Sequence, residues 1–199
     1  MLLDIHAPSR GNVKETFTVT VRHGDVPAAE HDGWLDMDGR LNLEFTGQNP
    51  SLMKLDIAPN PKAITVYLAG DSTVCDQDNI PFVGWGQMLP ILFKPSEVAV
   101  SNRATSGRTA QSFIQEKRRE DIDKTIKPGD YLLIQFGTND MKDKTLDAAK
   151  WKAFLQQYID DARKHQATAV LVTPMPRRQF DASGKITNTL GEFPQWMRD

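Results

Sequence analysis

Three short polar segments in this 199-residue sequence each follow an apolar run and carry residue types that can cleave an ester. They are "GDST" (70–73), "NRATSGR" (102–108) and "GTND" (137–140). The hydroxyl of Ser72 is a candidate nucleophile for acyl transfer. Gly107 can bring a bare backbone N–H close to a substrate oxygen, and Asn139 offers a side-chain amide donor. With the N–H of Ser72, these groups would stabilise the negative charge that develops on a carbonyl oxygen.

Four further residues in or near these segments are candidates for contacts with a ligand or for structural roles. Asp71 could contact substrate, or it could cap the following turn and orient its loop. Arg108 could hold the carboxylate of an acidic sugar, or it could bridge two loops at the surface. Asp140 is expected to accept hydrogen bonds from the backbone of its own turn. Trp85, in "GWGQ", could stack on a sugar, although a place in the core is the favoured interpretation.

The elements that must position these segments are apolar strands alternating with helices. Nearly continuous apolar runs predict four buried strands, at 63–70, 97–102, 130–137 and 168–174. Helices are predicted at 84–93, 109–126, 146–166 and 193–199. This alternation is typical of a parallel sheet covered on both faces. Right-handed crossovers would then place all three polar segments at the carboxyl edge of the sheet, where ligands bind.

The first 60 residues have a different pattern. Short alternating runs separated by turn residues occur at 15–21, 40–45 and 51–57. Alternation of period two predicts an antiparallel sheet with one wet face. The two prolines in "APNPKA" (58–63) would interrupt a continuing ladder. We therefore interpret residues 1–60 as a small antiparallel β segment, part of a β-sandwich accessory module, and residues 64–199 as an α/β domain.

Composition excludes several classes of partner and site. The formal net charge of −2 gives no electrostatic case for binding nucleic acid or an anionic membrane surface. The densest basic run, "KRRED" (117–121), is expected to be a solvated helix face. The single cysteine, Cys75, rules out an intrachain disulfide and a cysteine-based zinc site.

No apolar run reaches the roughly 20 residues of a membrane span. No signal peptide is visible at the start, so we expect either a cytosolic protein or an absent true N-terminus.

The three polar segments resemble the motif blocks of the SGNH (GDSL) hydrolase superfamily. "AGDST" resembles its first block, "SNRATSGRTAQSF" its second and "GTND" its third. The resemblance covers residues 64–199 and implies a flavodoxin-like three-layer α/β/α fold. It also implies Ser72 as nucleophile and Gly107 and Asn139 as oxyanion donors, with no metal or cofactor.

Within the superfamily, the sequence is most similar to rhamnogalacturonan acetylesterases. The residues that carry this similarity are "YLAGDSTV", "GWGQML", "QFGTND" and "ITNTLGEFPQWMRD". The resemblance implies removal of O-acetyl groups from the rhamnogalacturonan backbone of pectin. It implies an acetylated polysaccharide or oligosaccharide as the partner, and an extracellular or periplasmic location. The β segment is similar to modules that precede the esterase domain in some bacterial members.

Two features depart from the family pattern. Thr138 stands where the acetylesterases often have His, so we expect altered substrate contacts there with the Asn139 amide retained. The closing D-x-x-H block, which would supply the base and its orienting acid, is absent. The histidines are His6, His23, His31 and His165, and none stands in such a motif. We therefore expect the chain to be an incomplete fragment of a longer esterase, with impaired turnover because Ser72 lacks its base.

Two alternatives to a carbohydrate esterase remain open. The first is a lipase or thioesterase of the same superfamily, which an apolar acyl groove would favour. The second is a non-catalytic carbohydrate-binding fragment, which the β segment and the missing histidine would favour.

Overall fold

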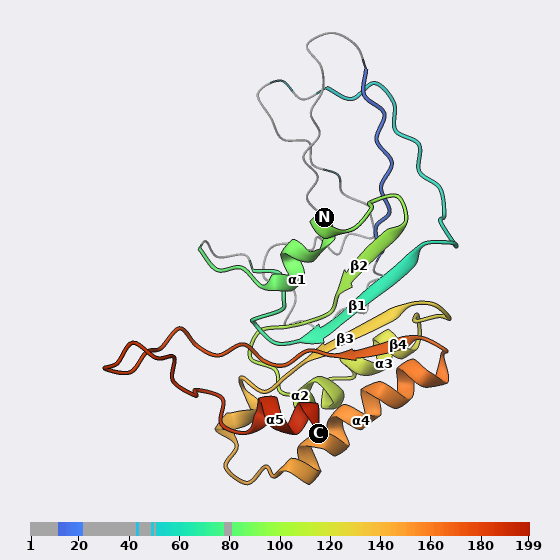
Figure 1. Ribbon diagram of the computed structural model, residues 1–199. Helices are drawn as coiled ribbons and strands as arrows, with labels where there is room; N and C mark the ends of the chain where they lie inside the picture. Colours follow the sequence, from blue (N-terminus) through green and yellow to red (C-terminus); the bar gives the residue numbers. More distant parts are fainter. Residues whose placement is uncertain (1–11, 22–42, 44–48, 50, 78–80) are drawn as a thin grey trace.

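The computed structural model describes residues 12–21, 43, 49, 51–77 and 81–199, and these contain a four-stranded parallel sheet (Figure 1). The strands are β1 (Ile64–Gly70), β2 (Val98–Asn102), β3 (Tyr131–Gln135) and β4 (Thr168–Leu171). Their spatial order is β2-β1-β3-β4, with every neighbouring pair parallel. This is the start of a flavodoxin-like order, and all four strands lie where the sequence predicts them.

Helices cover both faces of this sheet (Figure 1). On one face lie α1 (Trp85–Met88) and the short 3-10 helix η2 (Leu89–Leu92). On the other face lie α2 (Ala110–Gln115), α3 (Arg118–Asp123), α4 (Ala148–Lys164) and α5 (Phe193–Arg198). A second 3-10 helix, η3 (Asp140–Lys142), follows β3. The predicted α/β/α layering is confirmed, and Pro90 lies in the first turn of η2, where its missing N–H costs no hydrogen bond.

Alternate residues of β1 face two separate apolar clusters, and this pattern divides the core. Tyr67 and Ala69 pack with α2, α3 and α4, whereas Val66 and Leu68 pack with α1 and η2. The larger cluster contains three mutually packed rings, from Phe113, Phe136 and Tyr158. The inward face of α4 consists of Trp151, Leu155, Tyr158 and Ala162, with Ile159 less deeply buried beside them.

The helix predicted over 109–126 is two helices, which corrects the prediction. Lys117 takes a left-handed conformation with φ of 62° and separates α2 from α3. This break directs Arg118 inward, where its Nε lies 2.7 Å from Glu116 and its guanidinium donates to the Thr105 hydroxyl at 2.7 Å. Arg118 is 3% exposed, and Arg119 pairs with Asp161. The "KRRED" run is therefore only partly solvated, because its two arginines bond within the protein while Lys117 and Glu120 are exposed.

The β segment is not formed where the structure describes it. Residues 15–21 and 51–57 contain no strand, so these two predictions are wrong, and the run at 40–45 lies outside the described residues except for Leu43. Thr18 joins the domain by a backbone hydrogen bond to Pro95 (2.6 Å) and accepts one from Asn60 (2.9 Å). An alternating pattern makes a strand only when a second strand pairs with its backbone. The accessory β-sandwich module stays a prediction.

Candidate active site

Three loops meet at the carboxyl edge of the sheet. We call residues 71–77 the first loop, 103–109 the second loop and 136–142 the third loop. The N–H of Thr105 in the second loop donates to the carbonyl of Gly70, the last residue of β1 before the first loop (3.1 Å). The side-chain amide of Asn139 in the third loop donates to the Arg108 carbonyl in the second loop (3.1 Å). The structure therefore brings the three predicted segments side by side.

Two backbone donors of these loops are left unused. Within the described part of the chain, neither the N–H of Ser72 nor that of Gly107 donates to another protein atom. Gly107 is exposed and has φ of +80°, a conformation that residues with a Cβ rarely adopt. Ser72 itself is partly exposed at the end of β1. Both N–H groups therefore remain able to donate to a ligand.

The amide of Asn139 is held in one orientation. Lys142 donates to its Oδ1 at 2.8 Å, and its Nδ2 donates to Arg108. Because an amide nitrogen carries two hydrogens, one N–H remains for another acceptor. The Asn139 residue is 8% exposed, so little competing water reaches this donor.

Asp71 orders the first loop from inside and does not contact solvent. It is 0% exposed, and its Oδ1 accepts the N–H of Thr73 at 2.9 Å and the Thr73 hydroxyl at 2.8 Å. Burial raises the pKa of Asp71, whereas the hydrogen bonds of Thr73, the Thr138 hydroxyl and the Lys142 charge lower it. This burial contradicts the prediction that Asp71 contacts substrate and agrees with the loop-ordering alternative.

Arg108 and Thr138 also make contacts within the protein. The Nε of Arg108 lies 3.0 Å from Glu116, and its Nη1 donates to the Ser106 carbonyl at 2.9 Å. Glu116 accepts from Arg118 as well, and these two arginines lower its pKa against the opposing effect of burial. Arg108 therefore bridges the second loop to α2, as in the alternative interpretation. The Thr138 hydroxyl is buried and faces the Asp71 carboxyl, so it has no surface to offer a substrate.

A chain of hydrogen bonds with fixed directions lies under the first loop. The indole N–H of Trp85 donates to Gln135 Oε1 (2.9 Å), and Gln135 Nε2 donates to the Thr73 hydroxyl (2.6 Å). The Thr73 hydroxyl must then donate to Asp71. Each direction follows from the first, because an indole nitrogen can only donate. Trp85 packs on the smaller core cluster, so the interpretation of a core residue fits better than one of a sugar platform.

Asp140 joins the third loop to its neighbours. Its carboxylate accepts the backbone N–H groups of Ala110 and Gly137 and the indole N–H of Trp151, each at 2.9 Å. Burial raises the pKa of Asp140, while these same hydrogen bonds lower it. The predicted bond within its own turn is present, and the other two attach the turn to α2 and α4.

The described residues do not place a base beside Ser72. His165 follows the last turn of α4, with its Nε2 2.8 Å from Asp123 Oδ1. It precedes β4 and therefore lies at the amino edge of the sheet, opposite the loops. His6, His23 and His31 lie outside the described residues. Within the described ranges, no group of three His, Cys, Asp or Glu side chains could hold a metal ion, and no helix is long and apolar enough to cross a membrane.

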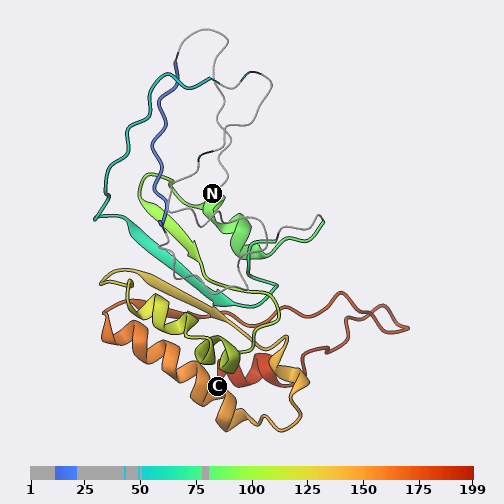
Figure 2. The same ribbon diagram turned by 180° about the vertical axis from the view of Figure 1, so that it is seen from behind.

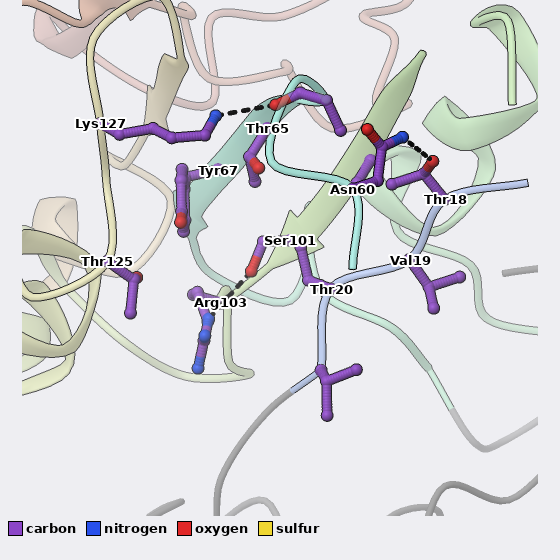
Figure 3. Close-up of a pocket in the computed structure, with 13 residues that line it drawn as sticks. Thr18, Val19, Thr20, Asn60, Thr65, Tyr67, Ser101, Arg103, Thr125 and Lys127 are labelled. Carbon is purple, nitrogen blue, oxygen red and sulfur yellow. Dashed lines mark hydrogen bonds between the residues drawn. The ribbon is translucent and has the colours of Figure 1, made fainter. Parts of the chain in front are cut away.

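The pocket in Figure 3, of about 220 Å³, does not include the candidate residues. It lies between residues 18–21 and the faces of β1 and β2, and its lining includes Tyr67, Ser101 and Lys127. Its cations already bond within the protein, Lys127 to Asp130 at 2.6 Å and Arg103 to Ser101 at 3.0 Å. The loops at the carboxyl edge therefore remain the better candidate for chemistry.

Sequence reasoning missed a β-hairpin that leaves the sheet at this same edge. Phe180 pairs with Ile186 across a turn in which Gly184 has φ of +78°. The signal was available in "DASGK" (181–185), because a type I turn followed by glycine in the left-handed region is a common hairpin connection.

Comparisons with known proteins agree with this fold. Residues 68–199 match the family described as the GDSL-like lipase/acylhydrolase family. Rhamnogalacturonan acetylesterase RhgT of Bacillus subtilis (strain 168) is 45% identical over 140 residues, which cover 69% of this chain and 60% of RhgT. The esterase YxiM of the same organism is 32% identical over 184 residues, which cover 90% of this chain and 46% of YxiM.

Solved structures show the same architecture. The crystal structure of YxiM matches with a TM-score of 0.62, covering 68% of this chain and 40% of that one. Axe2, an acetylxylan esterase of Geobacillus stearothermophilus, matches with a TM-score of 0.50 at 18% identity, covering 69% of this chain and 72% of Axe2. These matches support the flavodoxin-like fold of the SGNH hydrolases. The chain spans 60% of RhgT and about half of YxiM.

Proposed function

The chain belongs to the GDSL-like lipase/acylhydrolase family, and from this premise we propose that it is the Ser72-bearing part of a carbohydrate O-acetylesterase. The observation that supports the proposal is that the loops bearing Ser72, Gly107 and Asn139 meet at one edge of the sheet, where the N–H groups of Ser72 and Gly107 have no acceptor among the described residues and the Asn139 amide has one N–H left. The similarity to RhgT supports acetylated rhamnogalacturonan as the substrate. An extracellular or periplasmic location of the protein would suit a polysaccharide substrate.

The loops suggest a role for each group in the reaction. The Ser72 hydroxyl attacks the acetyl carbonyl carbon, and the carbonyl oxygen becomes negatively charged. The N–H groups of Ser72 and Gly107 and the second N–H of Asn139 donate to that oxygen. The sugar oxygen then leaves with a proton, and acetyl-Ser72 remains. Water attacks this ester and releases acetate and free Ser72.

The proton of Ser72 needs an acceptor that the described residues do not supply. Asp71 is the nearest carboxylate in sequence, but it is buried and already accepts two hydrogen bonds from Thr73. We propose that the base comes from a residue outside the described set. Small exogenous bases such as imidazole can then substitute for it.

The test is acetate release by the 199-residue chain from acetylated rhamnogalacturonan and from p-nitrophenyl acetate, with Ser72→Ala as the control. We expect acetylation of Ser72, detected by mass spectrometry, and turnover that rises with added imidazole. Turnover that is indifferent to imidazole and lost in His6→Ala, His23→Ala or His31→Ala would assign the base to that histidine. Equal rates for the chain and its Ser72→Ala variant would overturn the proposal.

A further inference from the structure

Residues 173–190, which we call the arm, leave the body of the molecule at the carboxyl edge. The arm begins after β4, whose last residue is Leu171, and returns to α5. Figures 1 and 2 show it projecting away from the sheet on the side where the strands end. It therefore starts beside the three loops and extends beyond them.

The tip of the arm is an ordered hairpin. The N–H of Asp181 donates to the Lys185 carbonyl (2.8 Å), and the N–H of Thr187 donates to the Gln179 carbonyl (2.8 Å). Inside the turn, Asp181 Oδ1 accepts from Ser183 N (2.9 Å), Ser183 Oγ (2.6 Å) and Lys185 N (3.0 Å). These bonds give the tip a defined shape without help from the core.

Both ends of the arm are anchored next to the third loop. Pro174 is buried against Gly137, where an added Cβ would lie 2.8 Å from the proline ring. Leu190, at the other end, is 1% exposed. The base of the arm is therefore attached next to the loop that carries Asn139, and the hairpin extends from there (Figure 1).

The arm leaves apolar and basic side chains in solvent. Phe180 and Ile186, which face each other across the hairpin, are 53% and 48% exposed. Arg177, Arg178 and Lys185 are exposed as well. The carboxylate of Asp181 is the arm's only acid and is used within the turn, so the arm has a net charge of +2 in a chain of formal charge −2. Exposed apolar side chains on a positively charged arm, in a chain whose net charge is negative, indicate a binding surface.

We propose that the arm is a binding element for an anionic polysaccharide, and that it holds a uronate-bearing chain while an acetylated residue lies at the three loops. Arg177, Arg178 and Lys185 pair with sugar carboxylates, for which guanidinium geometry is well suited. Phe180 and Ile186 offer an apolar ledge for the sugar rings. This inference rests on the proposed function, since it takes the same polymer as ligand.

The test is binding, measured without chemistry by affinity electrophoresis and calorimetry on the Ser72→Ala chain. The probes are de-acetylated rhamnogalacturonan oligosaccharides and neutral galactan. We expect binding to the acidic probe alone, weakening as salt rises. The R177Q/R178Q/K185Q variant is expected to raise Kd at least tenfold, and Phe180→Ala to raise it several-fold.

A matched control removes the same number of cations elsewhere. Lys62, Lys150 and Arg163 are exposed and stand outside residues 173–190, so K62Q/K150Q/R163Q is expected to keep the Kd of the parent. Every arm substitution is at an exposed position, and unchanged circular dichroism and melting temperature will show that each variant folds.

The possible outcomes separate this inference from the proposed function. Equal Kd for the arm variant and the control variant, or equal binding of galactan, would overturn the inference. A change in oligomeric state with the arm variant, at unchanged polymer binding, would assign the arm to self-association and also overturn it. If the acidic probe binds in a salt-sensitive way but Ser72 of the parent chain is never acetylated, the arm's role stands and the proposed esterase function is refuted.

Discussion

The two edges of the sheet use their buried polar groups differently. At the amino edge, Asp130 is 0% exposed and accepts the N–H groups of Thr65 and Lys127 and the Lys127 ammonium, at 2.6 to 3.0 Å. At the carboxyl edge, Asp140 is equally well bonded, but the N–H groups of Ser72 and Gly107 have no acceptor in the described part of the chain, and the Asn139 amide has one N–H left. The Oδ2 of Asp71 also lacks a regular hydrogen bond within the described residues.

This contrast distinguishes polar groups that stabilise the fold from polar groups that could bind a ligand. Buried polar groups are normally paired, because an unpaired one costs about 1–3 kcal/mol. Asp130 at the amino edge meets this rule, so its carboxylate serves the fold. At the carboxyl edge, donors of the described residues stay available where the strands end, as the proposed stabilisation of a developing negative charge would require.

The largest expected effect compares the two edges directly. Asp140→Ala and Asp130→Ala each leave buried donors unpaired and should lower the free energy of unfolding by roughly 3–5 kcal/mol. Only Asp140→Ala should also lower kcat per folded molecule, because Asp140 holds the third loop. Urea unfolding and active-site titration will measure both quantities. An Asp130→Ala chain with equally reduced kcat would break the distinction between the edges.

Asn139→Ala should reduce kcat by about 10²–10³-fold, the usual effect of losing one oxyanion donor. The free energy of unfolding should change little, because the side chain bonds only to Lys142 and to the Arg108 carbonyl near the surface. Steady-state kinetics on p-nitrophenyl acetate will test this. A higher KM at constant kcat would show that Asn139 binds ground state and transition state alike.

Thr73→Val should destabilise the fold by about 1–3 kcal/mol, because Gln135 loses its acceptor and Asp71 loses a donor. Thr73→Ser keeps the hydroxyl and should recover most of the loss in both stability and kcat. If serine rescues neither property, the methyl packing of Thr73 matters and the directed hydrogen-bond chain does not.

Asp71→Asn is expected to have the smallest effect, which depends on pH. Burial raises the pKa of Asp71 above the reference of 3.8, so the folded state holds the proton more tightly than the unfolded state. The contribution of Asp71 to stability is therefore full below that reference and is lost as pH rises through the folded pKa. The asparagine variant should gain in unfolding free energy relative to the parent between pH 3 and pH 7. A constant difference across this range would show that Asp71 does not titrate as proposed.

Parts of the fold could be read from the sequence because their signals are local. The apolar run from Ile64 to Gly70 can be buried only as a central strand, and the stripe containing Trp151 and Tyr158 requires a helix with one inward face. The alternating run at 15–21 carries an equally clear pattern, yet it forms no strand because pairing depends on a partner elsewhere in the chain. The break at Lys117 was hidden for the same reason, since the groups that bind Arg118 include Thr105 of another loop.

The residue types and their order along the chain determined that Ser72, Gly107 and Asn139 follow successive strands, and parallel strands bring such positions to one edge. Only the tertiary structure decided which polar groups at that edge bond within the protein and which remain able to bond to a ligand. It buried the Asp71 carboxyl and the Thr138 hydroxyl, it paired Arg108 with Glu116, and it left the arm in solvent. The physical reason is that a motif fixes which atoms are present, whereas hydrogen-bond satisfaction depends on every neighbour that folding brings within about 3 Å.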